Sequence, residues 1–513
     1  MSTTSDSQPA PTLFTRKATG LVREARTTDA LFYNVMWASV ALAFAFYWLL
    51  YGFAYQGSNA WVAFLIAACL GVPGAFLYAM LAQIMPRTGG DYVFNSRSLH
   101  PSVGFAGNFS YCVWLAVIYG VYTTYLATYG FGAFGRMMAG FTGSHAWLDF
   151  GDWFSKDYAL FITGTVMLLL SAAVFIVGGL HLFLRLQVVA FALYVLGAFL
   201  LPAIVALFQS KAGFLGNFQD YAANLGTQNA TGALAASAHK AGFAPTGFDT
   251  ETTLKSVSVF WYIFGFLYSS NYFAGVIRLR KRTHLVSIPG ALAVSVVGIA
   301  LLMVAYQGVT GYTFNGRLGF ADPAAYGFAV GLLIWLPQTM LLISRSMFSW
   351  SFDRIMPARL SYVDARTRSP VIAIAIVTVL AIGSTAIYAF TTWFTAISVL
   401  LGLSLTLLVT AVGGIVLPFR QRAMVENSPY GRRIAGIPIV SLVAAVSLIG
   451  FALAVAVILW DPGSGASLSA NPGKLWLALG IYALAFVIYF VSRAVRRSQG
   501  IDLSLTYREL PPE

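Results

Sequence analysis

Residues 85–93 read Met-Pro-Arg-Thr-Gly-Gly-Asp-Tyr-Val, and residues 96–101 continue as Ser-Arg-Ser-Leu-His-Pro. This short polar stretch separates two long apolar runs, 60–84 and 103–135. Its paired glycines permit a tight backbone turn, because a residue without Cβ adopts positive φ at little cost. The stretch therefore predicts a structured loop between two helices, and not a flexible linker.

The charges of this loop are close together in sequence. Asp91 follows the glycine pair, with Arg87 before it and Arg97 after it. We expect these three side chains to form an ion-pair network at the end of the two flanking helices.

The composition around the loop is that of a membrane protein. Of the 513 residues, 58% are hydrophobic and 10% are charged, against about 25% charged in soluble domains. A span requires about 20 mostly apolar residues, and the runs that qualify are 31–55, 60–84, 103–135, 158–178, 184–208, 257–277, 286–307, 323–349, 371–390, 393–417, 436–459 and 474–494. We predict an all-α membrane protein with twelve transmembrane helices.

Lysine and arginine residues predict the orientation. With the N-terminus inside, 24 of the 31 basic residues face the cytoplasm, as the positive-inside rule requires. We therefore expect a multi-pass protein of the cytoplasmic cell membrane whose tails, residues 1–30 and 496–513, are both cytoplasmic. The net charge of +13 is distributed between spans, so we expect the lipid bilayer as a partner and no nucleic acid.

The apolar runs contain no Asp, Glu, Lys or His near their centres. A proton relay of carboxylates within the bilayer is therefore not supported, and neither is an arginine-rich voltage sensor. An enzyme would require a cluster of catalytic or metal-binding side chains at the midplane. We therefore expect no catalytic residue, no enzymatic activity, no cofactor and no firmly bound metal.

Three segments together resemble a known family. They are the loop 85–97, the stretch 344–357 with the later 366–370, and Ala-Gly-Val-Ile-Arg at 274–278. These are similar to the P-R-(S/T)-G-G-x-Y loop, the end of helix eight and the exit from helix six in the amino acid–polyamine–organocation (APC) superfamily of transporters. The resemblance to these amino acid permease-like proteins extends over nearly the whole chain.

The resemblance implies a particular architecture. Helices one to five and six to ten form a five-plus-five inverted repeat, with broken helices one and six, and two additional helices follow. On this pattern, residues 31–417 form the transport core and 418–495 the two additional helices. The resemblance further implies that free backbone groups at the two breaks hold the substrate.

The first span departs from the family pattern. The family has a glycine-containing run at its break, whereas this chain has Trp37, Ala38, Ser39, Val40 and Ala41. The resemblance implies substrate binding at these five residues. The alternative is an unbroken helix whose small residues pack against neighbouring helices.

The sixth span carries polar residues between aromatic ones. Gly265 and Phe266 precede Ser269, Ser270 and Asn271. Polar groups within a membrane need partners, which either neighbouring helices or a substrate and water supply. Because the resemblance places the broken helix here, we expect these five residues to line the substrate cavity.

Further candidates come from the third and eighth spans. Tyr119, Tyr122 and Trp335 are candidate substrate-binding residues, although such aromatics are also ordinary packing residues. Thr339 and Ser344 are weak candidates for a sodium site, but a hydroxyl in a helix also bonds the preceding turn of its own helix.

The leading hypothesis is a secondary active transporter that moves amino acids, or related small amines or organic acids, by alternating access. A coupling ion, either sodium or a proton, is a possible second partner. The alternatives are a same-fold transporter of another solute, a channel or a membrane sensor.

Overall fold

The computed structural model describes residues 21–38, 55–280, 282–321, 330–391, 399–503 and 507. These residues are mostly helical. The first half contains α1 (Thr27–Ala38), α3 (Ala60–Ile84), α4 (Asp91–Ser98), α5 (Pro101–Leu126), η1 (Ala127–Gly132), α6 (Ala133–Thr142), α7 (His145–Trp153), α8 (Asp157–Val195), η2 (Leu196–Leu200), α9 (Leu201–Phe208), α10 (Lys211–Asn224) and α11 (Ala230–Lys240).

The second half begins with a helix that does not continue to the end of its predicted span. It contains α12 (Thr250–Gly265), η3 (Ser269–Tyr272), η4 (Ala274–Val276), α13 (Thr283–Thr310), α14 (Tyr312–Ala321), α15 (Val330–Phe352), η6 (Ala358–Ser361), α16 (Val371–Phe390), α17 (Val399–Arg420), α18 (Arg422–Glu426), β1 (Arg433–Ile434), β2 (Ile437–Pro438), α19 (Ile439–Trp460), η8 (Pro462–Ser464) and α20 (Pro472–Ser498). The two strands form a small antiparallel hairpin.

Eight helices of the described residues are long and apolar enough to cross a membrane. Each of the twelve predicted runs overlaps a helix of the structure. The number twelve nevertheless stays a prediction, because parts of runs 31–55, 323–349 and 393–417 lie outside the described residues. The inverted repeat likewise stays a prediction.

Local signals explain several helix ends. Asn59 accepts hydrogen bonds from the backbone of Trp61 and Val62 and so caps α3. Asp249 caps α12 through the backbone N–H of Thr252 at 2.6 Å. Such caps satisfy backbone donors that the first helical turn leaves unpaired.

α8 is one long element with a kink that corresponds to the predicted break between spans four and five. Gly179 has φ 62° and ψ −160°. A Cβ at this position would lie 2.2 Å from the carbonyl oxygen of Thr367 in the loop before α16. Glycine is required here both for the backbone conformation and for the close approach.

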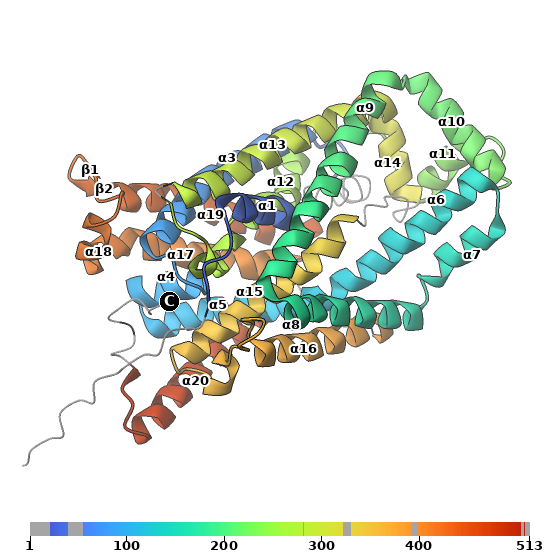
Figure 1. Cartoon of the computed structure of the whole chain (residues 1–513). Coiled ribbons are helices and arrows are strands. Elements are labelled where there is room, and N and C mark those ends of the chain that lie inside the picture. The colour runs from blue at the N-terminus through green and yellow to red at the C-terminus, as the bar shows by residue number, and fades with distance from the viewer. Residues whose placement is uncertain are drawn as a thin grey trace, which may run out of the picture.

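Figure 1 shows the helices as a bundle with two distinct ends. α4, α18 and the β1–β2 hairpin lie at one end, and α7, α10 and α11 lie at the other. We call the first the predicted inner end, since the basic residues assign it to the cytoplasm. The second carries α10 and α11, which lie in the long polar segment between the fifth and sixth predicted spans.

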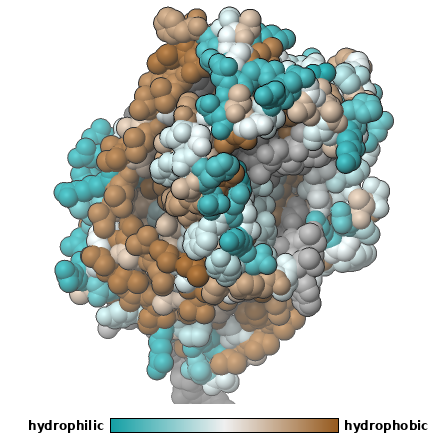
Figure 2. Space-filling model, turned by 90° about the vertical axis from the view of Figure 1, so that its right-hand side faces the viewer, coloured by the Kyte–Doolittle hydropathy of each residue, from teal (hydrophilic) through white to brown (hydrophobic). Residues whose placement is uncertain are grey.

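The surface of the bundle has the character expected of a protein in lipid. Many large apolar side chains on its long helices are exposed, including Leu169, Val189, Val379, Ile449 and Val487. Such an apolar exterior is unusual for a soluble protein. Figure 2 looks onto the end opposite the predicted inner end, where hydrophilic side chains are spread over the face and hydrophobic ones predominate along its left and lower margins.

Packing brings helices from distant parts of the sequence around one centre. α1 packs against α13 and α8, and α3 packs against α12, α13 and α19. α5 packs against α15, α16 and α20. The short segments η3 and η4, which follow α12, lie inside this arrangement and are fully buried.

Candidate functional site

The sixth predicted span changes from α-helix to 3₁₀ turns in its middle. α12 ends at Gly265, and Ser269–Tyr272 and Ala274–Val276 form the turns η3 and η4. The sequence predicted a break here, and the structure has one. Because a 3₁₀ turn leaves backbone groups without the α-helical pattern of bonds, this segment needs partners from other elements.

Asn34 of α1 supplies those partners for Ser270. The backbone N–H of Ser270 donates to Asn34 Oδ1 at 2.9 Å, and Asn34 Nδ2 donates to Ser270 Oγ at 3.0 Å. The same Nδ2 also donates to the carbonyl of Ser287 on α13 at 3.2 Å. One buried amide thus fixes α1, η3 and α13 to one another.

Four predicted aromatic residues lie together beside this segment. Trp37 stacks on Trp335 with ring centroids 4.8 Å apart, and Tyr122 meets Trp335 edge-on at 4.2 Å. Phe266, directly after α12, contacts Trp37 at 6.4 Å. We call these four residues the aromatic cluster. It joins α1, α5, α12 and α15, which the sequence separates by up to about 300 residues.

Polar atoms without hydrogen-bond partners lie at the same place. Neither the amide nitrogen nor the amide oxygen of the Asn271 side chain forms a hydrogen bond with a described residue, and the same holds for Trp37 Nε1. The hydroxyl of Tyr111 lies against the side chains of Trp37 and Ser269. A buried polar group without a partner costs about 1–3 kcal/mol, so this arrangement is suited to a polar ligand.

Tyr111 was missed by the sequence analysis, although a signal was present. It lies eleven residues before Tyr122 on α5, which is about three helical turns. The two tyrosines therefore share one face of the helix. Tyr111 also contacts the ring of Tyr272, at a centroid distance of 5.8 Å.

Other predicted residues lie apart or are already bonded. The hydroxyl of Tyr119 donates to Ser171 of α8 at 2.8 Å, so this tyrosine faces α8. The hydroxyl of Ser269 donates to the carbonyl of Phe266 at 3.0 Å. Gly265 is buried at the end of α12 and Ala38 at the end of α1. The remaining candidates Ser39, Val40 and Ala41 lie outside the described residues, so the predicted break of helix one stays a prediction.

The two weak sodium candidates use their hydroxyls within their own helix. Thr339 donates to the carbonyl of Trp335 at 2.9 Å, and Ser344 donates to that of Leu341 at 3.2 Å. Among the described residues, no group of three or more His, Cys, Asp and Glu side chains is placed to hold a metal ion. Sodium coupling therefore gains no support from these two residues.

The loop 85–97 docks directly onto η3. The N–H of Gly89 donates to the carbonyl of Tyr272 at 3.1 Å, and Thr88 and Phe273 form an antiparallel bridge. Gly89 has φ 118° and Gly90 has φ 52°. A Cβ on Gly89 would lie 2.7 Å from Ser349 Oγ, so the glycine pair permits both the turn and the close approach.

The charges of this loop are arranged differently from the prediction. Arg97 pairs with Asp353 at 2.8 Å and not with Asp91. Asp91 instead accepts hydrogen bonds from the hydroxyls of Tyr78, Tyr272 and Thr410. Proximity in sequence indicated Arg87 and Arg97 as partners of Asp91, whereas helix packing brings Asp353 to Arg97 from about 250 residues away.

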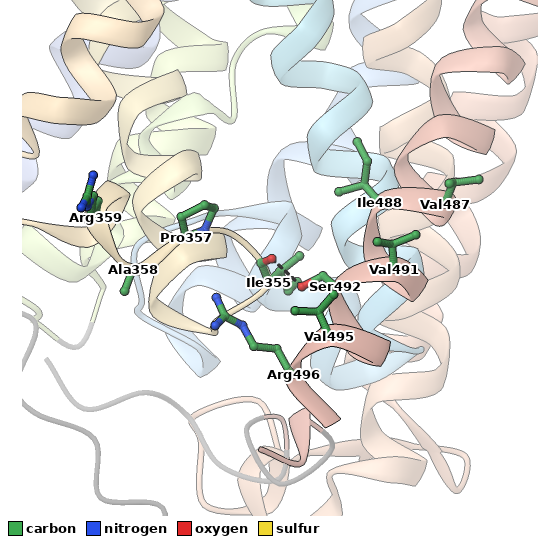
Figure 3. Close-up of a pocket in the computed structure, with 10 residues that line it drawn as sticks. All are labelled: Ile355, Pro357, Ala358, Arg359, Val487, Ile488, Val491, Ser492, Val495 and Arg496. Carbon is green, nitrogen blue, oxygen red and sulfur yellow. Dashed lines mark hydrogen bonds between the residues drawn. The ribbon is translucent and has the colours of Figure 1, made fainter. Parts of the chain in front are cut away.

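A separate groove opens on the surface near the predicted inner end, between η6 and α20 (Figure 3). It has a volume of about 730 Å³ and is lined by Ile355, Pro357, Ala358, Arg359, Val487, Ile488, Val491, Ser492, Val495 and Arg496. In Figure 3 the hydroxyl of Ser492 bonds the carbonyl of Ile355, at 2.6 Å. The groove shares no residue with the aromatic cluster.

A family model described as amino acid permease matches residues 26–486. The chain belongs to the amino acid permease family. The resemblance inferred from the three motifs is thereby confirmed, since the match includes all of them. No curated protein matches the chain.

The family assigns the permease to transport, and its apolar helices make it a multi-pass membrane protein. A small-molecule substrate follows from this family. The match includes α1, α5, α12, η3 and α15, so the aromatic cluster and the polar atoms beside it all belong to the permease domain.

Proposed function

We propose that the permease is a secondary active transporter that carries amino acids, or related small amines or organic acids, across the cell membrane by alternating access. The observation that carries the proposal is the buried side chain of Asn271, which lies in a 3₁₀ turn without a hydrogen-bond partner among the described residues. In a bilayer such an amide is expensive unless a ligand or water bonds it.

The neighbouring groups indicate the chemistry of the solute. Trp37 Nε1 is a donor that suits a carboxylate, and Asn271 provides both donors and an acceptor, which suit a carboxylate or an ammonium group. The aromatic cluster offers ring faces to an apolar side chain or to a cationic amine. A solute with one zwitterionic end and one apolar or basic end fits both parts.

The proposed transport core comprises residues 31–417, with 418–495 as two additional helices. Within it, the end of α12 at Gly265 and the buried turns after it resemble half of the paired breaks that hold substrate in inverted-repeat transporters. We propose that Trp37, Ala38, Ser39, Val40 and Ala41 form the matching half.

Thermal stabilisation by solutes tests the proposal, because a ligand that binds the native state must raise its apparent stability. Purified protein is heated with each standard amino acid, with small amines and with carboxylates, in the presence and absence of sodium. We expect one chemical class to raise the melting temperature. Solutes that do so are then tested for saturable uptake and trans-stimulation in proteoliposomes, since trans-stimulation excludes a channel.

A matched pair of variants locates the site. Trp335→Ala removes a stacked ring of the aromatic cluster and should abolish the solute-dependent shift. Trp476→Ala removes a ring that is 71% exposed on α20 and should leave the shift unchanged. Equal shifts in the two variants would place the solute elsewhere, and a complete absence of shift and uptake for all solutes would contradict the proposed function.

A further inference from the structure

Asp91 is a buried carboxyl group bonded by hydroxyls from three separate elements. Its Oδ1 accepts from Tyr78 of α3 at 2.5 Å and from Thr410 of α17 at 3.1 Å. Its Oδ2 accepts from Tyr272, the last residue of η3. Asp91 is only 2% exposed, and no ion pair joins it to a residue of the described ranges. Within those ranges, three hydroxyls and the backbone N–H of Asp91 itself stabilise its negative charge.

The other titratable groups around Asp91 are uncharged near neutral pH. Besides the two tyrosines that bond it, the groups that interact with it electrostatically are Tyr111 and Cys112 of α5 and Tyr482 of α20. Phenols and thiols lose their protons only in alkaline solution. Arg97 lies on the same helix as Asp91, but its guanidinium is 2.8 Å from Asp353. Of the groups named here, Asp91 is therefore the one whose protonation changes its charge without alkaline solution.

Burial raises the pKa of the Asp91 carboxyl above its ordinary value, and the hydrogen bonds from Tyr272, Tyr78 and Thr410 oppose that rise only in part. Desolvation has this direction because it disfavours the charged form of a carboxyl group. A raised pKa brings the titration of Asp91 closer to physiological pH.

Protonation of Asp91 changes the hydrogen bonds around its carboxyl group. An ionised carboxylate accepts bonds at both oxygens, and here it accepts three. A protonated carboxyl donates from one oxygen, so the hydroxyl that donated to that oxygen must turn away or become an acceptor. Tyr272 is the side chain that donates to Oδ2 among the described residues, so a proton on Oδ2 acts directly on Tyr272.

Tyr272 connects this change to the candidate site. It follows Asn271 in the chain, and its carbonyl accepts from Gly89, two residues before Asp91. A change at its hydroxyl therefore reaches the turn η3, which carries Ser270 and Asn271. The path from the carboxyl group to the unpartnered amide consists of one side chain and one peptide bond.

We propose that Asp91 is the binding site of the proton that drives solute transport, and that it acts through Tyr272 on the turn η3. This inference rests on the transport function proposed above. Proton binding at Asp91 favours one arrangement of η3 and proton release favours the other. The sequence alone does not predict such a group, because Asp91 lies in a polar loop and only the docking of that loop onto η3 buries it.

The test uses proteoliposomes with an equimolar mixture of the twenty radiolabelled standard amino acids. Uptake is measured with an acidic exterior and a neutral interior, and exchange is measured separately at equal pH. For one proton per solute, each unit of pH difference supports about tenfold accumulation. We expect the wild type to accumulate solute under this gradient. Asp91→Asn, which mimics the neutral carboxyl, should exchange solute but lose gradient-driven accumulation.

Asp149→Asn provides the matched control, since Asp149 is exposed on α7. It should accumulate solute as the wild type does. Accumulation by Asp91→Asn at the wild-type level would overturn the inference. So would a wild type that exchanges solute but does not respond to the gradient, although the proposed transport function would then stand. Failure of the wild type both to exchange and to accumulate would contradict amino acid transport itself, together with the inference that rests on it.

Tyr272→Phe gives a second measurement should Asp91→Asn fail to fold. This substitution removes the hydroxyl that donates to Asp91 Oδ2, and with it the contact through which the proton acts on η3. Correctly folded Tyr272→Phe should therefore exchange solute but lose most of its gradient-driven accumulation. Accumulation by Tyr272→Phe at the wild-type level would overturn the inference independently.

Discussion

The guanidinium of Arg97 lies 2.8 Å from the carboxylate of Asp353, and the side chains are only 1% and 2% exposed. Arg97 is on α4 and Asp353 directly follows α15, so the pair joins two elements far apart in sequence at the predicted inner end. Tyr92 donates to the same carboxylate at 2.6 Å. This relationship fixes the position of the loop that carries Asp91.

Removal of one partner of this pair should be strongly destabilising. Asp353→Asn leaves the guanidinium of Arg97 buried without its counter-charge, which costs about 3–5 kcal/mol. Thermal unfolding in detergent measures the loss. Asp152→Asn is the control, because its pair with Arg136 is substantially exposed and such pairs contribute about 0–1 kcal/mol. Equal melting temperatures for the two variants would contradict this prediction.

The C-terminal tail should stabilise the surroundings of the Arg97–Asp353 pair through Tyr507. The Arg97 guanidinium carbon lies 5.0 Å from the centroid of this ring, and the Tyr507 hydroxyl is 3.2 Å from that of Tyr92. Because Tyr507 is buried, Tyr507→Ala should cost about 3–5 kcal/mol, whereas Tyr507→Phe keeps the ring and should cost about 1 kcal/mol. Unfolding measurements should show little change for Tyr362→Ala, whose ring is 55% exposed.

The glycine pair of the loop should be intolerant of side chains. Gly89→Ala forces a Cβ to within 2.7 Å of Ser349 at a φ of 118°, so we expect a loss of about 1–3 kcal/mol or more. Gly480→Ala on α20 meets no atom within 4 Å and should stabilise that helix by about 0.5–1 kcal/mol. Melting temperatures that shift in opposite directions would support both predictions, and a neutral Gly89→Ala would contradict the first.

Substitution of Asn34 on α1 and of Asn271 in η3 should change the stability of the protein in opposite ways. Asn271→Ala removes polar atoms that have no partner among the described residues, so the protein without solute should keep or gain stability while solute-dependent stabilisation disappears. Asn34→Ala removes three hydrogen bonds and leaves the N–H of Ser270 unpaired, which costs about 1–3 kcal/mol. Melting curves with and without solute distinguish the two. Retention of the solute-dependent shift in Asn271→Ala would show that Asn271 does not contact the solute.

The sequence predicted the class of the fold because that class depends on local chemistry. Apolar runs of bilayer length, with basic residues between them, are sufficient to predict a helical membrane protein. The loop 85–97 and the stretch 344–357 were sufficient to predict the family. The break after Gly265 was implied by the family resemblance, and the polar residues in the middle of that apolar run agree with it because they need partners outside their own helix.

The choice of partners was decided by the tertiary structure alone. Asp91 is surrounded by tyrosines and not by the arginines next to it in sequence, and Tyr119 faces α8 although Tyr122, three residues later, joins the aromatic cluster. The physical reason is that a sequence pattern determines which face of a helix is buried. Which side chains meet across that face depends on how helices hundreds of residues apart pack together.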